Sequence, residues 1–227
     1  MTQNRRSTRP GAARPGRPTP VAELRPRMGR TTLIIAAVVA AVIVVLYLVF
    51  RSASPDAATA GGNTRFQVGT PGPGQAAPPF TLPAAGGATT SLADYRGKTV
   101  LLYFHEGLGC QPCWDQLRDL EKTNALTSVG VDDLVAITTG PADLLAQKLH
   151  DDNLHTPTLA DTTLSVSKTY RANSYGMMGT GADGHTFILV GPDGTIQWRA
   201  DYGGAPNYTM YVPPTQLLAD LKAGRTP

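Results

Sequence analysis

Hydrophobic and polar positions form their most informative pattern in the middle of the chain. Residues 98–104 are rich in apolar and β-favouring types, which predicts a buried strand. Beyond the next loop, Cys113, Leu117 and Leu120 recur at helical spacing, with charged residues on the opposite side. A glycine-containing loop joins the two elements and ends at Cys110. We therefore expect Cys110 and Cys113 at the point where a strand ends and a helix begins.

The remainder of the C-terminal part alternates between strand-like and helix-like patterns. A Gly/Asp-containing turn between two apolar runs predicts a β-hairpin near the end of the chain. The pattern favours an α/β fold in which helices cover a sheet and a cleft at the strand C-termini holds the site. The other expected elements are a hairpin within 78–92, strands at 131–139, 185–190 and 195–201, an extended piece at 156–160, helices at 141–151, 162–171 and 213–222, and a flexible Gly/Met loop at 173–184.

A long apolar run precedes this part of the chain. Residues 31–50 contain no charge and no proline, and at about 1.5 Å per residue such a helix spans a hydrocarbon core of about 30 Å. Arg25, Arg27 and Arg30 precede the run and only Arg51 follows it closely, so the positive-inside rule places the N-terminus in the cytoplasm and exports the remainder. The run exceeds the apolar core of a signal peptide, although the Ala-rich sequence after it leaves cleavage open. We expect a single-pass anchor in the lipid bilayer of the cell membrane.

Composition divides the chain further. Residues 1–30 hold eight Arg and one Glu with many Pro and Gly, which predicts a disordered basic cytoplasmic tail. Residues 51–77 are small, polar and Gly/Pro-rich, as in a flexible linker, and 78–227 form the globular, extracytoplasmic domain. Outside the tail the chain has 12 Lys and Arg against 16 Asp and Glu. The positive charge of the whole chain therefore gives no reason to expect nucleic-acid binding.

Cys110 and Cys113 are the only cysteines in the chain. A thiolate at a helix N-terminus has a lowered pKa and is the nucleophile of disulfide exchange. We expect Cys110 at or before the first turn and more exposed, with Cys113 one turn inward, where it can attack a mixed disulfide on Cys110. A structural disulfide and half of a zinc site are the alternatives, but a loop this short constrains the unfolded chain little and no second cysteine pair exists. An exported location, in which disulfides persist, adds to the redox interpretation.

Several segments together resemble the thioredoxin-like superfamily, in its alkyl hydroperoxide reductase C/thiol-specific antioxidant branch of redoxins and peroxiredoxin-like proteins. The resemblance covers roughly residues 75–225 and looks most like the membrane-anchored redoxins of actinobacteria. It implies a central mixed sheet flanked by helices, Cys110 as the attacking thiol and Cys113 as the resolving thiol. It also implies a protein disulfide or dithiol as substrate and a second protein as electron donor or acceptor. The matching segments are 77–82, 91–98, the strand into Cys110-Gln-Pro-Cys113, Asp161, 186–188 and Gly194.

Two positions depart from the patterns that this resemblance implies. Peroxidase members of the family have Thr three residues before the reactive cysteine, where this chain has Gly107. They also have Arg just before the late strand, and thioredoxins have a cis-proline there, whereas this chain has Gly184. A glycine permits close backbone approach. We therefore expect an open site at Gly184, in which Asp183 or His185 takes part in proton transfer at Cys110.

Other side chains near the cysteine pair are candidates for assisting roles. His105 and Glu106 precede the loop and are expected either to tune the pKa of Cys110 or to be solvated. Trp114 is expected to flank the site, partly exposed. Met177 and Met178 either line a substrate groove or fill core space, and we favour the core.

These observations favour a membrane-anchored, extracytoplasmic thiol–disulfide oxidoreductase that uses Cys110 and Cys113 and needs no cofactor or metal. The first alternative is a thiol-dependent peroxidase of the peroxiredoxin kind, which would pass through a sulfenic acid. The second is a Cu(I)-binding or copper-delivery module similar to the Sco-type copper chaperones. In that case Cys110, Cys113 and His185 would supply the metal ligands.

Overall fold

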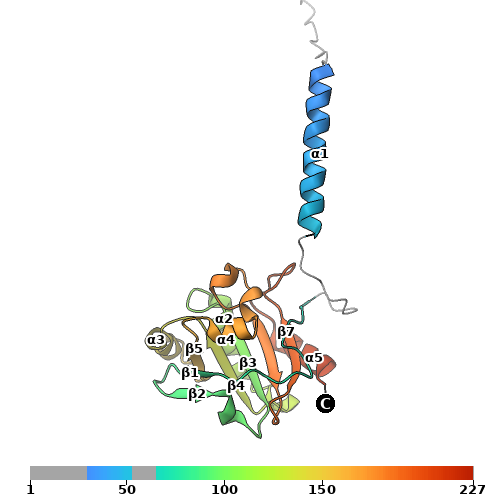
Figure 1. The fold of residues 1–227 in the computed structure, drawn as a ribbon. Coiled ribbons are helices and arrows are strands. Elements are labelled where there is room, and N and C mark those ends of the chain that lie inside the picture. The colour runs from blue at the N-terminus through green and yellow to red at the C-terminus, as the bar shows by residue number, and fades with distance from the viewer. Residues whose placement is uncertain (1–29, 53–64, 227) are drawn as a thin grey trace, which may run out of the picture. The chain divides into compact units, whose positions relative to one another are not determined.

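The computed structural model describes residues 30–52 and 65–226 (Figure 1). The chain divides into two compact units, residues 1–59 and 60–227. Helix α1 (Arg30–Ser52) belongs to the first unit, and its side chains from 34 to 46 are exposed. Among the described residues, no helix combines the length and apolar character needed to cross a membrane, so the predicted transmembrane segment is not confirmed. The predicted tail, apart from its last residue, and residues 53–64 of the predicted linker lie outside the described residues.

A five-stranded mixed sheet forms the centre of the second unit, with strand order β5-β4-β3-β6-β7. Parallel pairs join β3 to β4 and β4 to β5, whereas antiparallel pairs join β3 to β6 and β6 to β7. The mixed α/β fold predicted from the sequence is confirmed. The strands are β3 (Val100–His105), β4 (Asp133–Thr138), β5 (Thr158–Ala160), β6 (Thr186–Val190) and β7 (Ile196–Asp201), and β1 (Thr81–Pro83) and β2 (Thr89–Ser91) form a separate hairpin.

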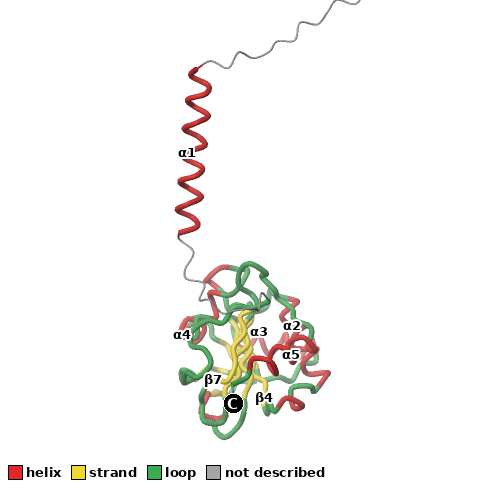
Figure 2. The backbone as a smooth tube through the Cα atoms, turned by 90° about the vertical axis from the view of Figure 1, so that its right-hand side faces the viewer, coloured by secondary structure: helices red, strands yellow, loops and turns green. Residues whose placement is uncertain are grey.

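Helices cover both faces of the sheet, which Figure 2 shows nearly edge-on. Every residue of β3 is buried, and its side chains alternate between two apolar clusters. Leu101 and Tyr103 pack in the cluster with residues of α2, α3 and α5, whereas Leu102 and Phe104 pack with residues of α4 and the β1–β2 hairpin. The helices are α2 (Gln111–Thr123), α3 (Ala142–Asp152), α4 (Ser165–Thr169) and α5 (Pro214–Gly224), and single 3₁₀ turns lie at Leu92–Tyr95, Thr127–Val129, Ala172–Ser174 and Gly179–Gly181.

One edge of the sheet collects the candidate residues. The C-terminal residues of β3 and β4, His105 and Thr138, are paired in register, and Phe104 of β3 pairs with Thr186 at the start of β6. The loop that follows β3 and the loop that precedes β6 therefore lie next to each other at this edge of the sheet. This arrangement brings the residues around 106–114 close to those around 183–185, which are distant in sequence.

The segment 65–77 is not the flexible tether that its composition predicts. Gln67 pairs with Asp201 through two backbone hydrogen bonds, and Ala76 bridges to Thr195. Gly and Pro give this segment few side chains to bury, so composition alone suggests a linker. Backbone bonding to β7 orders it instead.

Candidate active site

Cys110 and Cys113 form a disulfide whose Cα atoms are 5.3 Å apart. Cys110 is the N-cap residue of α2 and Cys113 lies in its first turn, with Pro112 at one of the first two helical positions. The predicted placement between a strand and a helix is therefore confirmed. Cys110 is 6% exposed and Cys113 is fully buried, so Cys110 is the more accessible of two largely covered residues.

Gly107 shapes the loop that carries Cys110. Its φ angle is +90°, in the left-handed region that favours glycine. Its carbonyl accepts hydrogen bonds from the Cys110 N–H and the Trp114 indole Nε1–H, each at 3.1 Å. A Cβ at this position would lie 2.6 Å from the carbonyl oxygen of Thr139. The loop therefore has no room for the threonine that peroxidase members carry here.

Trp114 is fully buried, which corrects the expectation that it flanks the site in a partly exposed position. Its hydrogen bond to Gly107 directs the indole beneath the loop. Its ring packs edge-on against the ring of His105, with centroids 4.9 Å apart, and the Lys148 ammonium lies 5.8 Å from the ring centroid. Trp114 therefore supports the loop from within.

His185 lies beside the buried cysteine. Its Nδ1 atom is 4.0 Å from the Cys113 sulfur and 3.2 Å from the Tyr103 hydroxyl. The imidazole is fully buried, and burial together with the nearby His105 lowers the pKa of His185 to about 3. His185 is therefore neutral at physiological pH. The sequence predicts that His185 acts at Cys110. The structure places it instead next to Cys113, the disulfide partner of Cys110.

His105 ends β3 inside the core and is not part of a solvated loop. Its ring stacks on Tyr103 with centroids 5.2 Å apart, and its Nδ1 atom accepts the Gly107 N–H at 3.4 Å. Burial lowers the pKa of His105 to about 3. Its ring contacts Tyr103, Trp114 and the Gly107 N–H, which gives it a packing position behind the cysteine loop.

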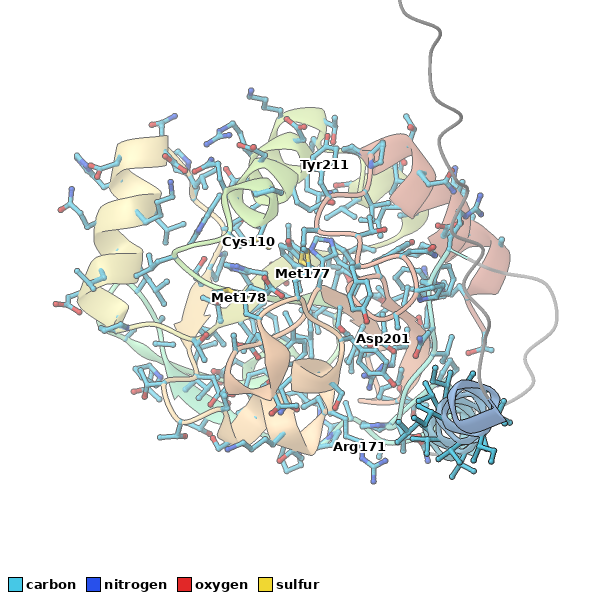
Figure 3. The ribbon with its side chains drawn as sticks, turned by 90° about the horizontal axis from the view of Figure 1, so that it is seen from above. Cys110, Arg171, Met177, Met178, Asp201 and Tyr211 are labelled. Atoms are coloured by element: carbon cyan, nitrogen blue, oxygen red, sulfur yellow. A yellow bond between two sulfur atoms is a disulfide. The ribbon has the colours of Figure 1, made fainter. Side chains whose placement is uncertain are left out.

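Glu106 is also buried, but its carboxylate turns toward the Gly/Met loop. One carboxylate oxygen accepts the backbone N–H groups of Met177 and Met178. Both methionine side chains are more than 60% exposed, so the core position favoured for them is wrong. Figure 3 labels Met177 and Met178 close to Cys110 in the view from above. The direct contacts of Glu106 order the Gly/Met loop and do not include a cysteine.

Asp183, near the end of this loop in sequence, is fully buried. Neither carboxylate oxygen forms a hydrogen bond of normal geometry with the described residues. The pKa of Asp183 is raised to about 8, mainly by burial and in smaller part by the charge of Asp161, while the Ser167 hydroxyl and the Thr139 backbone oppose the rise. Ser167, Thr139 and Asp161 are the neighbours that act on its carboxylate. The expectation that Asp183 assists Cys110 stays a prediction.

Gly184 does not leave an open site. A Cβ at this position would overlap the carbonyl oxygens of Tyr175 and Ala172. The His185 N–H donates to the Tyr175 carbonyl at 2.8 Å, which fixes the same segment against the start of β6. The backbone of 172–175 therefore occupies the space expected to be open, and both neighbours of Gly184, Asp183 and His185, are fully buried.

Tyr103 is a site residue that the sequence pattern does not single out. Its hydroxyl lies 3.2 Å from His185 Nδ1 and donates to the Cys113 carbonyl oxygen at 3.3 Å. Burial, followed by the charge of Glu106, raises the pKa of Tyr103 well above 10, so the hydroxyl stays protonated. The signal that could have found it is a tyrosine hydroxyl within a strand whose apolar pattern predicts complete burial.

A surface pocket of about 380 Å³ runs along α2 from the cysteine motif. It is lined by Pro112, Asp115, Arg118, Asp119, Lys122 and Tyr211. Among the residues that the structure describes, no three His, Cys, Asp or Glu side chains are grouped so as to hold a metal ion. The copper hypothesis therefore gains no support from the geometry and stays a prediction.

Comparisons with known proteins place this geometry in a family. The model of the AhpC/TSA family matches residues 73–199, which is more than half of the chain. The Mycobacterium tuberculosis H37Rv protein named "Putative peroxiredoxin Rv2521" is 34% identical over 129 residues, which cover 55% of this chain and 81% of that protein.

Solved structures show the same fold. Peroxidoxin BcpB from M. tuberculosis superposes with a TM-score of 0.54 at 21% identity, covering 68% of this chain and 99% of that one. A peroxiredoxin-like protein from Aquifex aeolicus superposes with a TM-score of 0.57 at 12% identity, covering 70% and 91%. The chain is therefore a thioredoxin-like oxidoreductase or thiol peroxidase, and it belongs to the AhpC/TSA family.

Proposed function

We propose that this protein is a thiol–disulfide oxidoreductase that cycles Cys110 and Cys113 between dithiol and disulfide. The observation that carries the proposal is the disulfide itself, formed at the N-terminus of α2. In the reductive direction, the Cys110 thiolate attacks a substrate disulfide and releases one substrate thiolate. Cys113 then attacks the Cys110 sulfur and releases the second. Two electrons pass to the substrate, and the protein disulfide forms.

The geometry supports Cys110 as the attacking residue. Its position at the N-cap of α2 places it at the positive end of the helix, which favours the thiolate. It is also the cysteine with measurable exposure, whereas Cys113 has none. The pocket along α2 includes Pro112, which lies between the two cysteines in sequence, and it offers a substrate peptide a place to bind. Its charged lining, which contains both Asp and Lys or Arg, suits a polar peptide.

A hydroperoxide is the alternative substrate, and family membership supports it. Two features of this chain disfavour it. The Gly107 loop excludes a hydroxyl-bearing side chain next to Cys110, and the packing at Gly184 excludes the arginine that peroxidases place there. The groups that polarise a peroxide in peroxidases are therefore missing at both positions.

The two activities separate in solution. The full-length reduced chain should reduce insulin disulfides, and Cys110→Ser should abolish this activity. Cys113→Ser should instead accumulate a mixed disulfide on Cys110, which non-reducing electrophoresis detects. Stopped-flow oxidation by hydrogen peroxide at a rate no faster than that of a free thiol would agree with the proposal. Fast peroxide oxidation without insulin reduction would replace it with the peroxidase function.

The cellular location is proposed from the sequence. The uncharged run at 31–50 and the arginines before it support a membrane anchor with the enzyme domain outside the cytoplasm. A partner protein must then reduce or oxidise the pair between turnovers, because each cycle leaves the cysteines in the other redox state. Resistance of the full-length protein to alkaline extraction from membranes would support the anchor, and its release would overturn it.

A further inference from the structure

A fully buried polar cluster lies behind the disulfide. The Tyr103 hydroxyl lies between His185 Nδ1, at 3.2 Å, and the Cys113 carbonyl oxygen, at 3.3 Å. His185 Nδ1 is also 4.0 Å from the Cys113 sulfur. All three residues are fully buried. One ring nitrogen of His185 therefore faces both a hydroxyl and the sulfur of the resolving cysteine.

Hydrogen-bond accounting decides which ring nitrogen carries the proton. A neutral imidazole has one N–H donor and one acceptor nitrogen. The Nε2 atom of His185 is buried and has no partner among the described residues. Placing the proton there would leave a buried donor unpaired, which is costly. With the proton on Nδ1, the imidazole donates to the Tyr103 oxygen, and the Tyr103 hydroxyl donates to the Cys113 carbonyl.

We propose that Tyr103 fixes His185 in its Nδ1–H form, and that this N–H stabilises the thiolate of Cys113 when the disulfide is reduced. The proposal rests on the dithiol cycle described above and adds a positioning pair to it. Hydrogen bonds to charged groups are stronger than those between neutral groups. The resolving sulfur would thereby become a better nucleophile toward the mixed disulfide on Cys110.

The redox step balances with glutathione as the reductant. Two glutathione thiols lose two electrons and become glutathione disulfide, while the Cys110–Cys113 bond breaks. Both thiol protons go to the solvent, because the Cys110 sulfur stays a thiolate at the N-terminus of α2 and the Cys113 sulfur stays a thiolate next to the His185 N–H.

Few charged groups complicate the titration of Cys113. His105 stacks on the other face of Tyr103 and is neutral, since burial lowers its pKa to about 3. Glu106 acts on the Tyr103 hydroxyl through its charge. Tyr202 contributes an aromatic ring 6.4 Å from His185, and its own pKa is raised by burial. The nearest N–H donor to the Cys113 sulfur among these groups is that of His185.

The test measures the thiol pKa of Cys113 by thiolate absorbance in full-length Cys110→Ser protein, where Cys113 is the single cysteine. His185→Leu removes the donor, and we expect the Cys113 pKa to rise by about one unit, a tenfold change in ionisation. His185→Asn can place its amide N–H where the Nδ1–H of histidine lies, and it should keep the Cys113 pKa close to that of the parent. Tyr103→Phe removes the oxygen that accepts the His185 Nδ1–H, so both neutral tautomers of His185 become populated. We expect a Cys113 pKa between those of the parent and His185→Leu.

Controls separate this inference from the proposed function. His105→Leu removes an equally buried histidine that lacks the sulfur contact, and it should leave the Cys113 pKa unchanged. Imidazole ¹H–¹⁵N spectra of the unsubstituted protein report the His185 tautomer without any substitution. An Nε2–H tautomer, or equal Cys113 pKa values in the parent and His185→Leu, would overturn the inference. The proposed function is tested independently, by insulin reduction with the unsubstituted chain.

Discussion

The guanidinium of Arg199 and the carboxylate of Asp201 form an ion pair in which both side chains are fully buried, with 2.9 Å between Nε and Oδ2. Asp201 also accepts the Gly69 backbone N–H at 2.6 Å, and Arg199 donates to the Pro71 carbonyl at 2.9 Å. Both charges are therefore satisfied by further hydrogen bonds. Through these bonds the pair holds the segment before the domain core against β7.

Replacing one partner of this pair should destabilise the fold strongly. Arg199→Met leaves the Asp201 charge buried, and we expect a loss of roughly 3–5 kcal/mol in the free energy of unfolding. Urea denaturation of the full-length chain measures the loss. Lys98→Met removes an exposed partner of Asp133 and serves as the control, with an expected change below about 1 kcal/mol. Equal effects of the two substitutions would refute the importance of burial here.

Glu106 should control the mobility of the Gly/Met loop. Glu106→Ala removes the acceptor for the Met177 and Met178 N–H groups, so their amide hydrogens should exchange at least about tenfold faster. Glu106→Gln retains a side-chain carbonyl oxygen and should keep most of the protection. Hydrogen exchange resolved at these two amides tests this. Unchanged protection in the alanine variant would mean that other contacts hold the loop.

Local pattern predicts the elements of this domain well because the relevant signals lie within a few residues. The apolar run into β3 and the helical spacing after Cys113 require only neighbouring positions, and the structure confirms both. The cysteine pair follows from the same local context. The predicted helix at 162–171 shortens to Ser165–Thr169 in the structure.

Burial around the site depends on how the loops fold back and on contacts between separate elements, and the pattern of apolar and polar positions does not report these. Gly184 is closed by the carbonyl of Tyr175, and the indole of Trp114 is drawn inward by the carbonyl of Gly107. The exposure of Met177 follows from a carboxylate that is 71 positions away in the chain. Alternation along β3 would have placed Tyr103 on the same face as the helix that carries the cysteines, but pairing it with His185 required the fold.

Gly184 should tolerate no side chain. Gly184→Ala places a methyl group against the carbonyls of Tyr175 and Ala172, so the backbone must move, and we expect a loss of about 2 kcal/mol or more in unfolding free energy. Gly181→Ala lies in the same loop with no heavy atom within 4 Å of the added carbon, and it should be nearly neutral. Thermal unfolding of both variants gives the comparison. An alanine at 184 as stable as the parent would show that the 172–175 segment can retreat.

Asp183 should make stability depend on pH in the opposite direction from a salt-bridged carboxylate. Burial raises its pKa from the ordinary value of 3.8 to about 8 in the folded state, so between these two values the folded protein binds one proton more than the unfolded chain. The free energy of unfolding should therefore fall as pH rises from about 4 to 8, by roughly 1 kcal/mol per pH unit, and level off above pH 8.

Asp183→Asn keeps the shape of the side chain and removes its titration. The contributions of the other ionisable groups to the pH dependence of stability then cancel when the variant is compared with the parent. The stability of the variant relative to the parent should rise steadily from pH 5 to pH 8. Urea midpoints measured for both proteins at several pH values give this difference directly. A difference that stays constant across the range would show that Asp183 remains ionised in the folded protein, held by polar contacts stronger than those to Ser167 and Thr139.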